Sequence, residues 1–288
     1  MHSSENRGKS RMILAMIIFS SIGIVRKYIP YESSLIALVR GIIGAVFLIL
    51  LVRGRKIPLN KQAIKDNLPL LILSGTAIGF NWILLFEAYN YTSVATATLC
   101  YYLAPIFVII FSPFVLKEKI SVKNLICTVL ALVGIILVSG VLVPSAEYNP
   151  SNLTGILLGL AAAVLYACVI LMNKRMKPIP AYEKAILQLS AASAALLPYV
   201  LLTNTFRNLS FDAAAILLLL AAGIVHTGIA YTLYFSSMEK LKSHTIALLS
   251  YIDPVLAVVL STVVLKEPMS LSSVIGAMLI LGSSFVSE

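Results

Sequence analysis

Long apolar segments repeat along the whole chain, and they limit its possible folds more than any other feature. They recur about every 29 residues and are mostly 18–24 residues long, enough for a helix to cross a hydrocarbon core of about 30 Å. A segment in lipid must satisfy its own backbone hydrogen bonds, which favours helices. Only 12% of the 288 residues are charged, against roughly 25% in soluble domains. The sequence therefore predicts an all-α, polytopic membrane protein.

We expect ten transmembrane helices joined by loops too short to hold a soluble domain. The first run, Met12–Val25, follows basic residues as in a signal peptide. We interpret it as a membrane helix, because no small-residue cleavage site precedes Arg26 and because it pairs with a later segment. The ten segments are expected at residues 11–29, 33–52, 68–90, 92–115, 121–141, 153–173, 183–203, 213–235, 243–265 and 270–287.

Basic residues are distributed unevenly between the two predicted sides of the membrane. The N-terminus and every second loop hold 17 Lys and Arg residues, the most basic loop being Arg53–Asn67. The opposite side holds four, and Arg40 lies inside a segment; the four are Arg26, Lys27, Arg207 and Lys266. This asymmetry predicts that both termini are cytoplasmic, in a cell membrane. The net charge of +10 thus reflects membrane topology and gives no reason to expect a nucleic-acid partner.

Neither cysteine spacing nor any catalytic motif indicates an enzyme. The three cysteines, Cys100, Cys127 and Cys168, fall inside apolar segments without a CxxC pair, so we expect buried thiols and no disulfide framework. The chain has no HExxH, Walker-type GxxxxGK[ST] or GxSxG sequence. We expect no cofactor or metal, and transport driven by a gradient or by exchange.

The second half of the chain repeats the first. Tyr251–Pro254 echoes Tyr102–Pro105, 149 residues earlier, and an ungapped register of residues 86–121 against 235–270 gives 11 identities in 36 positions. Both copies leave the membrane through Val-Leu-Lys-Glu, at Val115–Glu118 and Val264–Glu267. We therefore predict repeats at residues 12–141 and 153–287, joined by an external linker over 142–152. Five segments per repeat invert the second copy relative to the first, as in many secondary transporters.

A proline lies near the middle of the fourth and ninth segments. Pro105 frees the carbonyl of Tyr101 from helical hydrogen bonding, and Pro254 frees that of Ser250. Such breaks are tolerated in lipid where protein or water surrounds them. The two prolines are candidate hinges at a midplane site, or else plain structural kinks.

Three ionisable side chains besides tyrosine and cysteine are predicted deep in the membrane: Arg40, His226 and Asp253. Such residues usually face a cavity or each other. Asp253, whose counterpart is Ala104, is a candidate proton carrier or partner of a cation; it could instead pair with Arg40 or His226, or cap a freed backbone group. Arg40 suits either a structural ion pair or a carboxylate clamp. His226 suits either helix packing or the site.

Aromatic residues gather at a similar depth, where their faces could bind a cation and their hydroxyl groups could form hydrogen bonds. About half of them would merely pack between helices. With Asn81, which precedes the tryptophan, they complete the predicted substrate-binding set: Trp82, Tyr101, Tyr102, Tyr166, Tyr231 and Tyr251.

At these residues the chain resembles the drug/metabolite transporter superfamily, in its members with two EamA domains. The resemblance rests on Phe86–Ala95, Leu103–Pro105, Leu116–Glu118, Ile252–Pro254 and Leu265–Pro268, with Ala37–Arg40 fitting the second helix. Phe19–Ser21 departs from the Trp-Gly-Ser common in relatives. The resemblance implies ten helices with both termini inside, and a central cavity lined by helices one to four and six to nine.

The predicted function is that of a secondary active transporter that exports a small amphipathic metabolite, such as an amino acid or derivative, by alternating access. One alternative is an importer of a quaternary amine, held in an aromatic box. Another is a membrane scaffold or sensor that transports nothing. The expected partners are the substrate, the lipid bilayer and a coupling proton. The chain is expected as a monomer or as a homodimer formed through the small-residue faces of segments five and ten.

Overall fold

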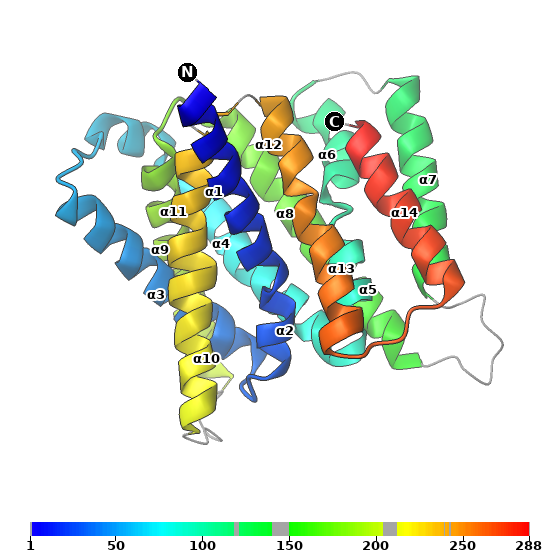
Figure 1. Ribbon diagram of the computed structural model, residues 1–288. Coiled ribbons are helices and arrows are strands. Elements are labelled where there is room, and N and C mark those ends of the chain that lie inside the picture. Colours follow the sequence, from blue (N-terminus) through cyan, green and yellow to red (C-terminus); the bar gives the residue numbers. More distant parts are fainter. Residues whose placement is uncertain are drawn as a thin grey trace.

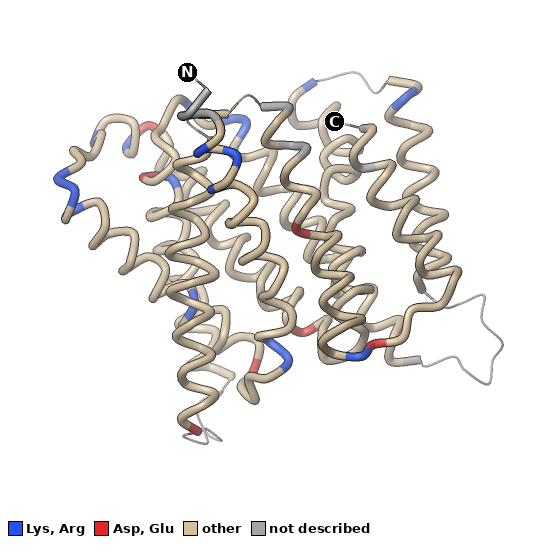
Figure 2. The backbone as a smooth tube through the Cα atoms, viewed as in Figure 1, with Lys and Arg blue, Asp and Glu red and all other residues tan. Residues whose placement is uncertain are grey.

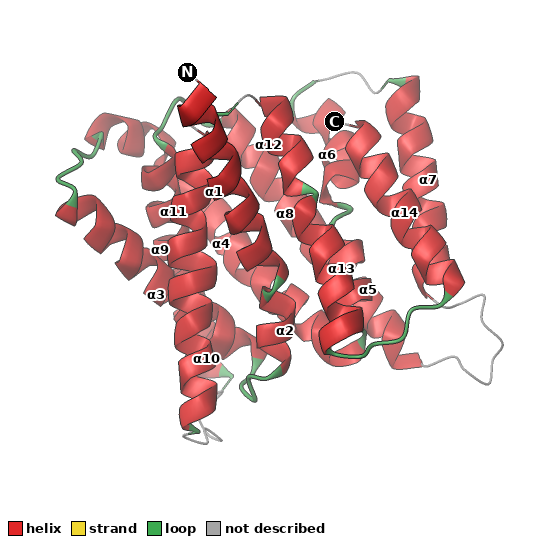
Figure 3. Cartoon of the chain, viewed as in Figure 1, coloured by secondary structure: helices red, strands yellow, loops and turns green. Residues whose placement is uncertain are grey.

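The chain is helical throughout the part that the structure describes. The computed structural model describes residues 2–117, 121–139, 150–203, 212–238, 240–241 and 243–287, and these ranges contain helices and loops but no β-strand (Figures 1 and 3). The predicted all-α class is confirmed. Glu118, Arg207 and residues 142–149 of the predicted linker lie outside the described residues.

The predicted segments correspond to single helices or to helices broken near the middle. In chain order the helices are α1 (His2–Ser20), α2 (Ile22–Lys27), α3 (Ser33–Gly54), α4 (Lys61–Tyr91), α5 (Val94–Tyr101), α6 (Ala104–Val115), α7 (Val122–Ser139), α8 (Pro150–Arg175), α9 (Ala181–Leu202), α10 (Ala213–Gly223), the π-helix η2 (Ile224–Ile229), α11 (Ala230–Met238), α12 (Ser243–Ser250), α13 (Ile252–Val264) and α14 (Leu271–Ser287).

Within the described residues, seven helical stretches are long and apolar enough to cross a membrane. They are Asn6–Lys27, Ser33–Gly54, Lys61–Tyr91, Val94–Val115, Ser151–Arg175, Ala181–Leu202 and Ala213–Ser237. Three shorter apolar helices cover Val122–Val138, Ile252–Val264 and Leu271–Ser283. The chain is therefore a multi-pass membrane protein.

The loop predicted over Arg53–Asn67 is wrong in its second half. Helix α4 begins at Lys61, because the side chain of Asn60 accepts a hydrogen bond from the backbone N–H of Ala63 at 3.0 Å and caps the helix. The predicted linker is likewise shorter at its end, since α8 begins at Pro150.

Helix α4 lies at the centre of the bundle and packs against α8 and α9 (Figure 1). Its contact with α9 requires a glycine: a Cβ atom on Gly75 would lie 2.5 Å from the carbonyl oxygen of Gln188. Small residues that let helix backbones approach closely are typical of membrane bundles. The same interface is joined by a hydrogen bond from Gln188 to Ser74, 2.7 Å long.

Helices that are equivalent in the two halves of the chain, 149 residues apart, pack against equivalent partners. Helix α4 packs on α8 as α11 packs on α1, and α5 and α6 pack on α8 as α12 and α13 pack on α1. The backbone also leaves the two equivalent helices, α6 and α13, in the same way. The N–H of Leu116 donates to the Ser112 carbonyl and that of Leu265 to the Ser261 carbonyl. Lys117 and Lys266 follow with φ of 59° and 56°, a left-handed backbone uncommon outside glycine.

Helices α7 and α14 form a peripheral pair beside the main bundle (Figure 1). They approach each other through Gly134 and Gly276: a Cβ atom on Gly276 would lie 2.6 Å from the Gly134 carbonyl oxygen. These small-residue faces, predicted as a possible dimer contact, thus pack within one chain. A groove of about 440 Å³ between the two helices, lined by Ile126, Leu130 and Met278 among others, lies apart from the predicted site residues.

Both chain ends lie at the same end of the bundle (Figure 1). Most Lys and Arg residues also lie at that end (Figure 2). We call this the basic end. The opposite end, which carries the exits of α2 and α13, is called the far end.

Candidate functional site

Two broken helices face each other in the middle of the bundle. The fourth segment breaks between α5 and α6, and the ninth breaks at Tyr251 between α12 and α13. Pro105 and Pro254 stand in the first turns of α6 and α13, where a missing N–H costs no helical hydrogen bond. The helix breaks predicted at the two prolines are present, and each proline stands at the start of a new helix; their role as hinges stays a prediction.

One hydrogen bond joins the two breaks. The hydroxyl group of Tyr102 donates to the carboxylate of Asp253. The ring of Tyr101 contacts those of Tyr102 and Tyr166, with centroids 5.8 and 5.3 Å apart. Tyr101 and Tyr166 also lie within electrostatic range of Asp253. A carboxylate bordered by aromatic rings is a suitable site for an amine.

Arg40 lies on α3 and is only 5% exposed. Its Nε–H donates to the hydroxyl oxygen of Thr227 at 2.7 Å. The guanidinium carbon stands 4.4 Å from the ring centroid of Trp82 and 5.7 Å from that of Phe86. Cation–π contacts of this kind stabilise a charge that has left water. Tyr101 and Tyr231 of the aromatic group also lie within electrostatic range of Arg40.

The partner of Arg40 is presented by a π-helix. Within η2 the hydroxyl group of Thr227 donates to the carbonyl of Ala222, five residues back, at 3.2 Å. One turn of π-helix inside an α-helix often marks a functional site. Here it aims Thr227 at Arg40, and it places His226 Nε2 3.0 Å from the hydroxyl oxygen of Ser21.

Several polar atoms of these residues have no hydrogen-bond partner in the part of the chain that the structure describes. The Nη atoms of Arg40, the free carboxylate oxygen of Asp253 and the hydroxyl groups of Tyr101, Tyr166 and Tyr231 form no hydrogen bond within the described residues. They are also absent from the fully buried unpartnered polar atoms of those residues. The atoms of Arg40, Asp253, Tyr101 and Tyr231 are therefore partly accessible, and the residue Tyr166 is 38% exposed although it lies mid-helix. Hydrogen-bonding capacity that the described residues do not use therefore remains on a cation, a carboxylate and several hydroxyl groups.

Other predicted site residues have contacts within the protein, and their role in substrate binding stays a prediction. The Asn81 amide donates to the Ala162 carbonyl at 2.6 Å and is buried. His226 is bound to Ser21, and the ring of Tyr251 packs edge-on against Phe285 with centroids 5.4 Å apart. The ion pairs of Asp253 with Arg40 or His226, considered from the sequence, are not formed among the described residues.

Thr227, which binds Arg40, and Ser21, which binds His226, were not predicted from the sequence. Gly228 follows Thr227 directly, and Gly23 stands two residues after Ser21. Phe19, Tyr234 and Phe235 also extend the aromatic group, since their rings contact one another or Tyr231. The π-turn itself has no recognisable sequence signal.

Comparison with known proteins is consistent with this arrangement of helices. A crystal structure of a protein superposes with a TM-score of 0.64 over 97% of this chain and 95% of that one, at 20% identity, which shows a shared fold. The "Uncharacterized transporter YxxF" of Bacillus subtilis (strain 168) is 30% identical over 254 residues, 88% of this chain and 80% of that protein. An "Uncharacterized transporter" of Clostridium kluyveri is 24% identical over 97% of this chain and 92% of its own.

The family comparison covers almost the whole chain. The EamA-like transporter family matches twice, over residues 7–140 and 153–287, which include both helix breaks and both halves of the Arg40–Asp253 region. With this match, the helical membrane fold and the similarity to transporters, the chain belongs to the EamA-like transporter family.

Proposed function

We propose that this chain is a secondary active transporter that exports a small amphipathic metabolite carrying both an amine and a carboxylate, such as an amino acid or derivative. The observation that carries the proposal is a pair of charged groups with atoms that form no hydrogen bond among the described residues. These atoms are the Nη atoms of Arg40 and one oxygen of Asp253. Arginine can bind a carboxylate through two parallel hydrogen bonds. Asp253 would bind the amine, and the open tyrosine hydroxyl groups would contact the rest of the substrate.

We further propose ten membrane segments in two inverted repeats, over residues 12–141 and 153–287. The matching packing pairs and the matching backbone at Lys117 and Lys266 support the repeats. The gathering of Lys and Arg at the end that carries both termini supports a cytoplasmic placement of that end, in a cell membrane (Figure 2). We propose that the chain acts as a monomer or as a homodimer.

Alternating access about the hinges Pro105 and Pro254 would expose the site to each side in turn. At the far end α5 packs against α13. The corresponding halves α6 and α12 are not among the closely packed helix pairs of the described residues. This asymmetry supports a conformation closed at the far end and accessible from the basic end, the state in which an exporter would take up its substrate.

A thermal-shift screen of a metabolite library on the purified protein tests the substrate class. We expect stabilisation by one or more amino acids or derivatives, and weaker stabilisation by the same compounds with the carboxylate amidated. Arg40→Lys keeps the charge but loses the planar two-donor edge, so it should reduce the preference for the carboxylate at least tenfold. Equal stabilisation of acid and amide by the wild-type protein would refute the carboxylate site.

Flux in liposomes that contain only this chain tests transport and coupling. We expect transport of the screened compounds to rise with a pH gradient, and Asp253→Asn to abolish this dependence in a folded protein. Normal proton-coupled flux in that variant would exclude Asp253 as the proton carrier. Absence of flux for every compound that binds would favour a scaffold or sensor instead.

The aromatic group around Asp253 also favours a second candidate, an importer of a quaternary amine. Choline-like compounds should then stabilise the protein and amino acids should not. The uncommitted Nη edge of Arg40 argues for the zwitterionic substrate, because a purely cationic ligand would leave that charge without a partner.

A further inference from the structure

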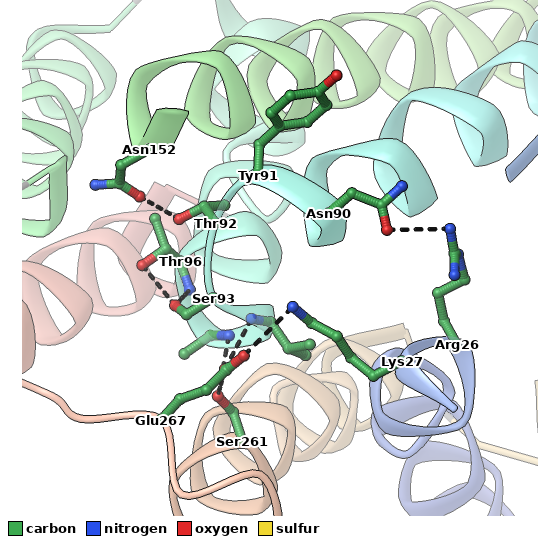
Figure 4. Close-up of polar contacts among 12 residues, drawn as sticks. Arg26, Lys27, Asn90, Tyr91, Thr92, Ser93, Thr96, Asn152, Ser261 and Glu267 are labelled. Carbon is green, nitrogen blue, oxygen red and sulfur yellow. Dashed lines mark hydrogen bonds and ion pairs between the residues drawn. The ribbon is translucent and has the colours of Figure 1, made fainter. Parts of the chain in front are cut away.

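The far end of helix α5 is held by an acidic residue that is distant in sequence. The carboxylate of Glu267 accepts a hydrogen bond from the backbone N–H of Val94 at 2.9 Å and another from the hydroxyl group of Ser261 (Figure 4). The N–H of Ala95 donates to the same Ser261 oxygen at 3.3 Å. The first N–H groups of a helix have no partner inside the helix, and a carboxylate there is favourable. Glu267 and Ser261 thus complete the start of α5.

Glu267 also connects α5 to α2. One of its oxygens lies 3.7 Å from the ammonium nitrogen of Lys27, and both side chains are partly buried (Figure 4). The neighbouring Arg26 donates to Asn90 at 3.2 Å and to Ser33 at 3.1 Å, so α2 is tied to α4 and α3 as well. Three segments distant in sequence therefore meet at Glu267.

The backbone before Glu267 explains how the carboxylate reaches this position. Helix α13 ends at Val264, and the left-handed φ of 56° at Lys266 turns the chain back toward the helix. The N–H of Glu267 then donates to the carbonyl of Ser261 at 3.3 Å. The repeated Leu-Lys-Glu exit is thus, in its second copy, a turn that presents the carboxylate to α5.

The other end of α5 reaches the proposed substrate site. Tyr101 is its last residue, and the following Tyr102 donates to Asp253 at the start of α13. Helices α5 and α13 are therefore joined at both ends, by Glu267 at the far end and by Asp253 in the middle. Because α5 is only eight residues long, a change in the position of its start would be transmitted to Tyr102.

We propose that Glu267 is a positioning residue: it holds α5 against α13 and α2, which closes the far end and aligns Tyr102 with Asp253. The part of this inference that concerns substrate binding rests on the proposed function. Release of Val94 and Lys27 from Glu267 opens the far end. A substrate amine that competes with Tyr102 for Asp253 weakens the hydrogen bond that joins the other end of α5 to α13.

Distance measurements between two spin labels test the closure without any substrate. The labels are placed by Tyr91→Cys and Val263→Cys, both exposed in the native protein, with Cys100, Cys127 and Cys168 replaced by Ala. The series compares the wild type with Glu267→Gln, Glu267→Ala and Ser261→Ala. Lys266→Gln is the matched control, since Lys266 is the exposed neighbour of Glu267, lies in the left-handed turn and has no ion pair among the described residues.

We expect a longer distance to gain population in the order wild type, Glu267→Gln, Glu267→Ala. Gln keeps an acceptor for Val94 and Ser261 but loses the charge facing Lys27, whereas Ala loses both. The ratio of long to short distances should rise at least tenfold in Glu267→Ala, about 1.4 kcal/mol. Ser261→Ala should fall between wild type and Glu267→Ala, and Lys266→Gln should match the wild type.

Ligand affinity, measured with a compound from the thermal-shift screen, should weaken in the same order. A wild-type distance distribution in folded Glu267→Ala would overturn the proposal, and so would weaker affinity without any change in distance. If Glu267→Ala does not fold, Glu267→Gln and Ser261→Ala decide by the same criteria. If no compound binds any variant, the proposed function fails, but the distance series still decides the role of Glu267.

Discussion

The guanidinium group of Arg40 is held by one hydroxyl group and two aromatic rings, and Thr227 provides the only hydrogen bond to it from the described residues. Thr227→Val keeps nearly the same shape but leaves the buried Nε–H without an acceptor, which costs about 1–3 kcal/mol. We expect a lower melting temperature and roughly tenfold weaker binding of the carboxylate ligand, with little change for its amide.

Thr227→Ser is the matched control, because it retains the hydroxyl group and removes only a methyl group. Its melting temperature and its preference for acid over amide should stay close to those of the wild type. If Thr227→Val and Thr227→Ser lose that preference equally, packing by the methyl group and not the hydrogen bond determines the orientation of Arg40.

At the scale of single elements, the proline breaks are the most direct test of hinge motion. Pro105→Ala and Pro254→Ala each restore a backbone N–H and remove a steric clash, so the two halves of each segment can join into one helix. We expect both variants to remain folded and to transport at least tenfold more slowly in liposomes. Pro113→Ala, inside α6 and away from the break, should keep the wild-type rate. Full activity of both hinge variants would leave the prolines as structural features only.

The α7–α14 pair makes a second prediction, about stability. Gly276→Ala would place a Cβ atom 2.6 Å from the Gly134 carbonyl oxygen, and overpacking of this kind costs about 1–3 kcal/mol. Its melting temperature in detergent should fall while ligand binding to the folded protein is retained. Gly282→Ala is the control on the same helix, because its Cβ atom would meet nothing within 4 Å. Equal melting temperatures of the two variants would contradict the close contact.

For the whole molecule, the features that could be predicted are those that depend on one continuous stretch of sequence. Segment length and hydropathy predicted the helices, and the covalent properties of Pro105 and Pro254 predicted where two of them would be interrupted. The contact of Glu267 with Val94 could not be predicted, because it joins residues 173 apart and depends on the turn at Lys266. The π-helix that presents Thr227 was missed because a widened turn has the same composition as its neighbours.

Depth in the membrane predicted Arg40, Asp253 and the tyrosines as site residues, and equally Asn81 and His226. The side chains of Asn81 and His226 form hydrogen bonds to Ala162 and Ser21, whereas Arg40 and Asp253 keep side-chain atoms without a hydrogen bond among the described residues. Whether a polar group faces a ligand or a neighbouring helix depends on the rotation of its helix, which the sequence pattern of these almost wholly apolar segments does not determine.

The proposed inverted arrangement of the repeats predicts that equivalent residues lie on opposite sides of the membrane. Lys117 and Lys266 are the best pair for this test, since both are exposed and share the same left-handed backbone, so that cysteine should perturb them equally. In a chain without native cysteines, a membrane-impermeant maleimide added to intact cells should label Lys266→Cys and leave Lys117→Cys unlabelled. After permeabilisation both should react. Labelling of both positions in intact cells would contradict the inverted repeat, and labelling of Lys117→Cys alone would reverse the orientation inferred from the basic end.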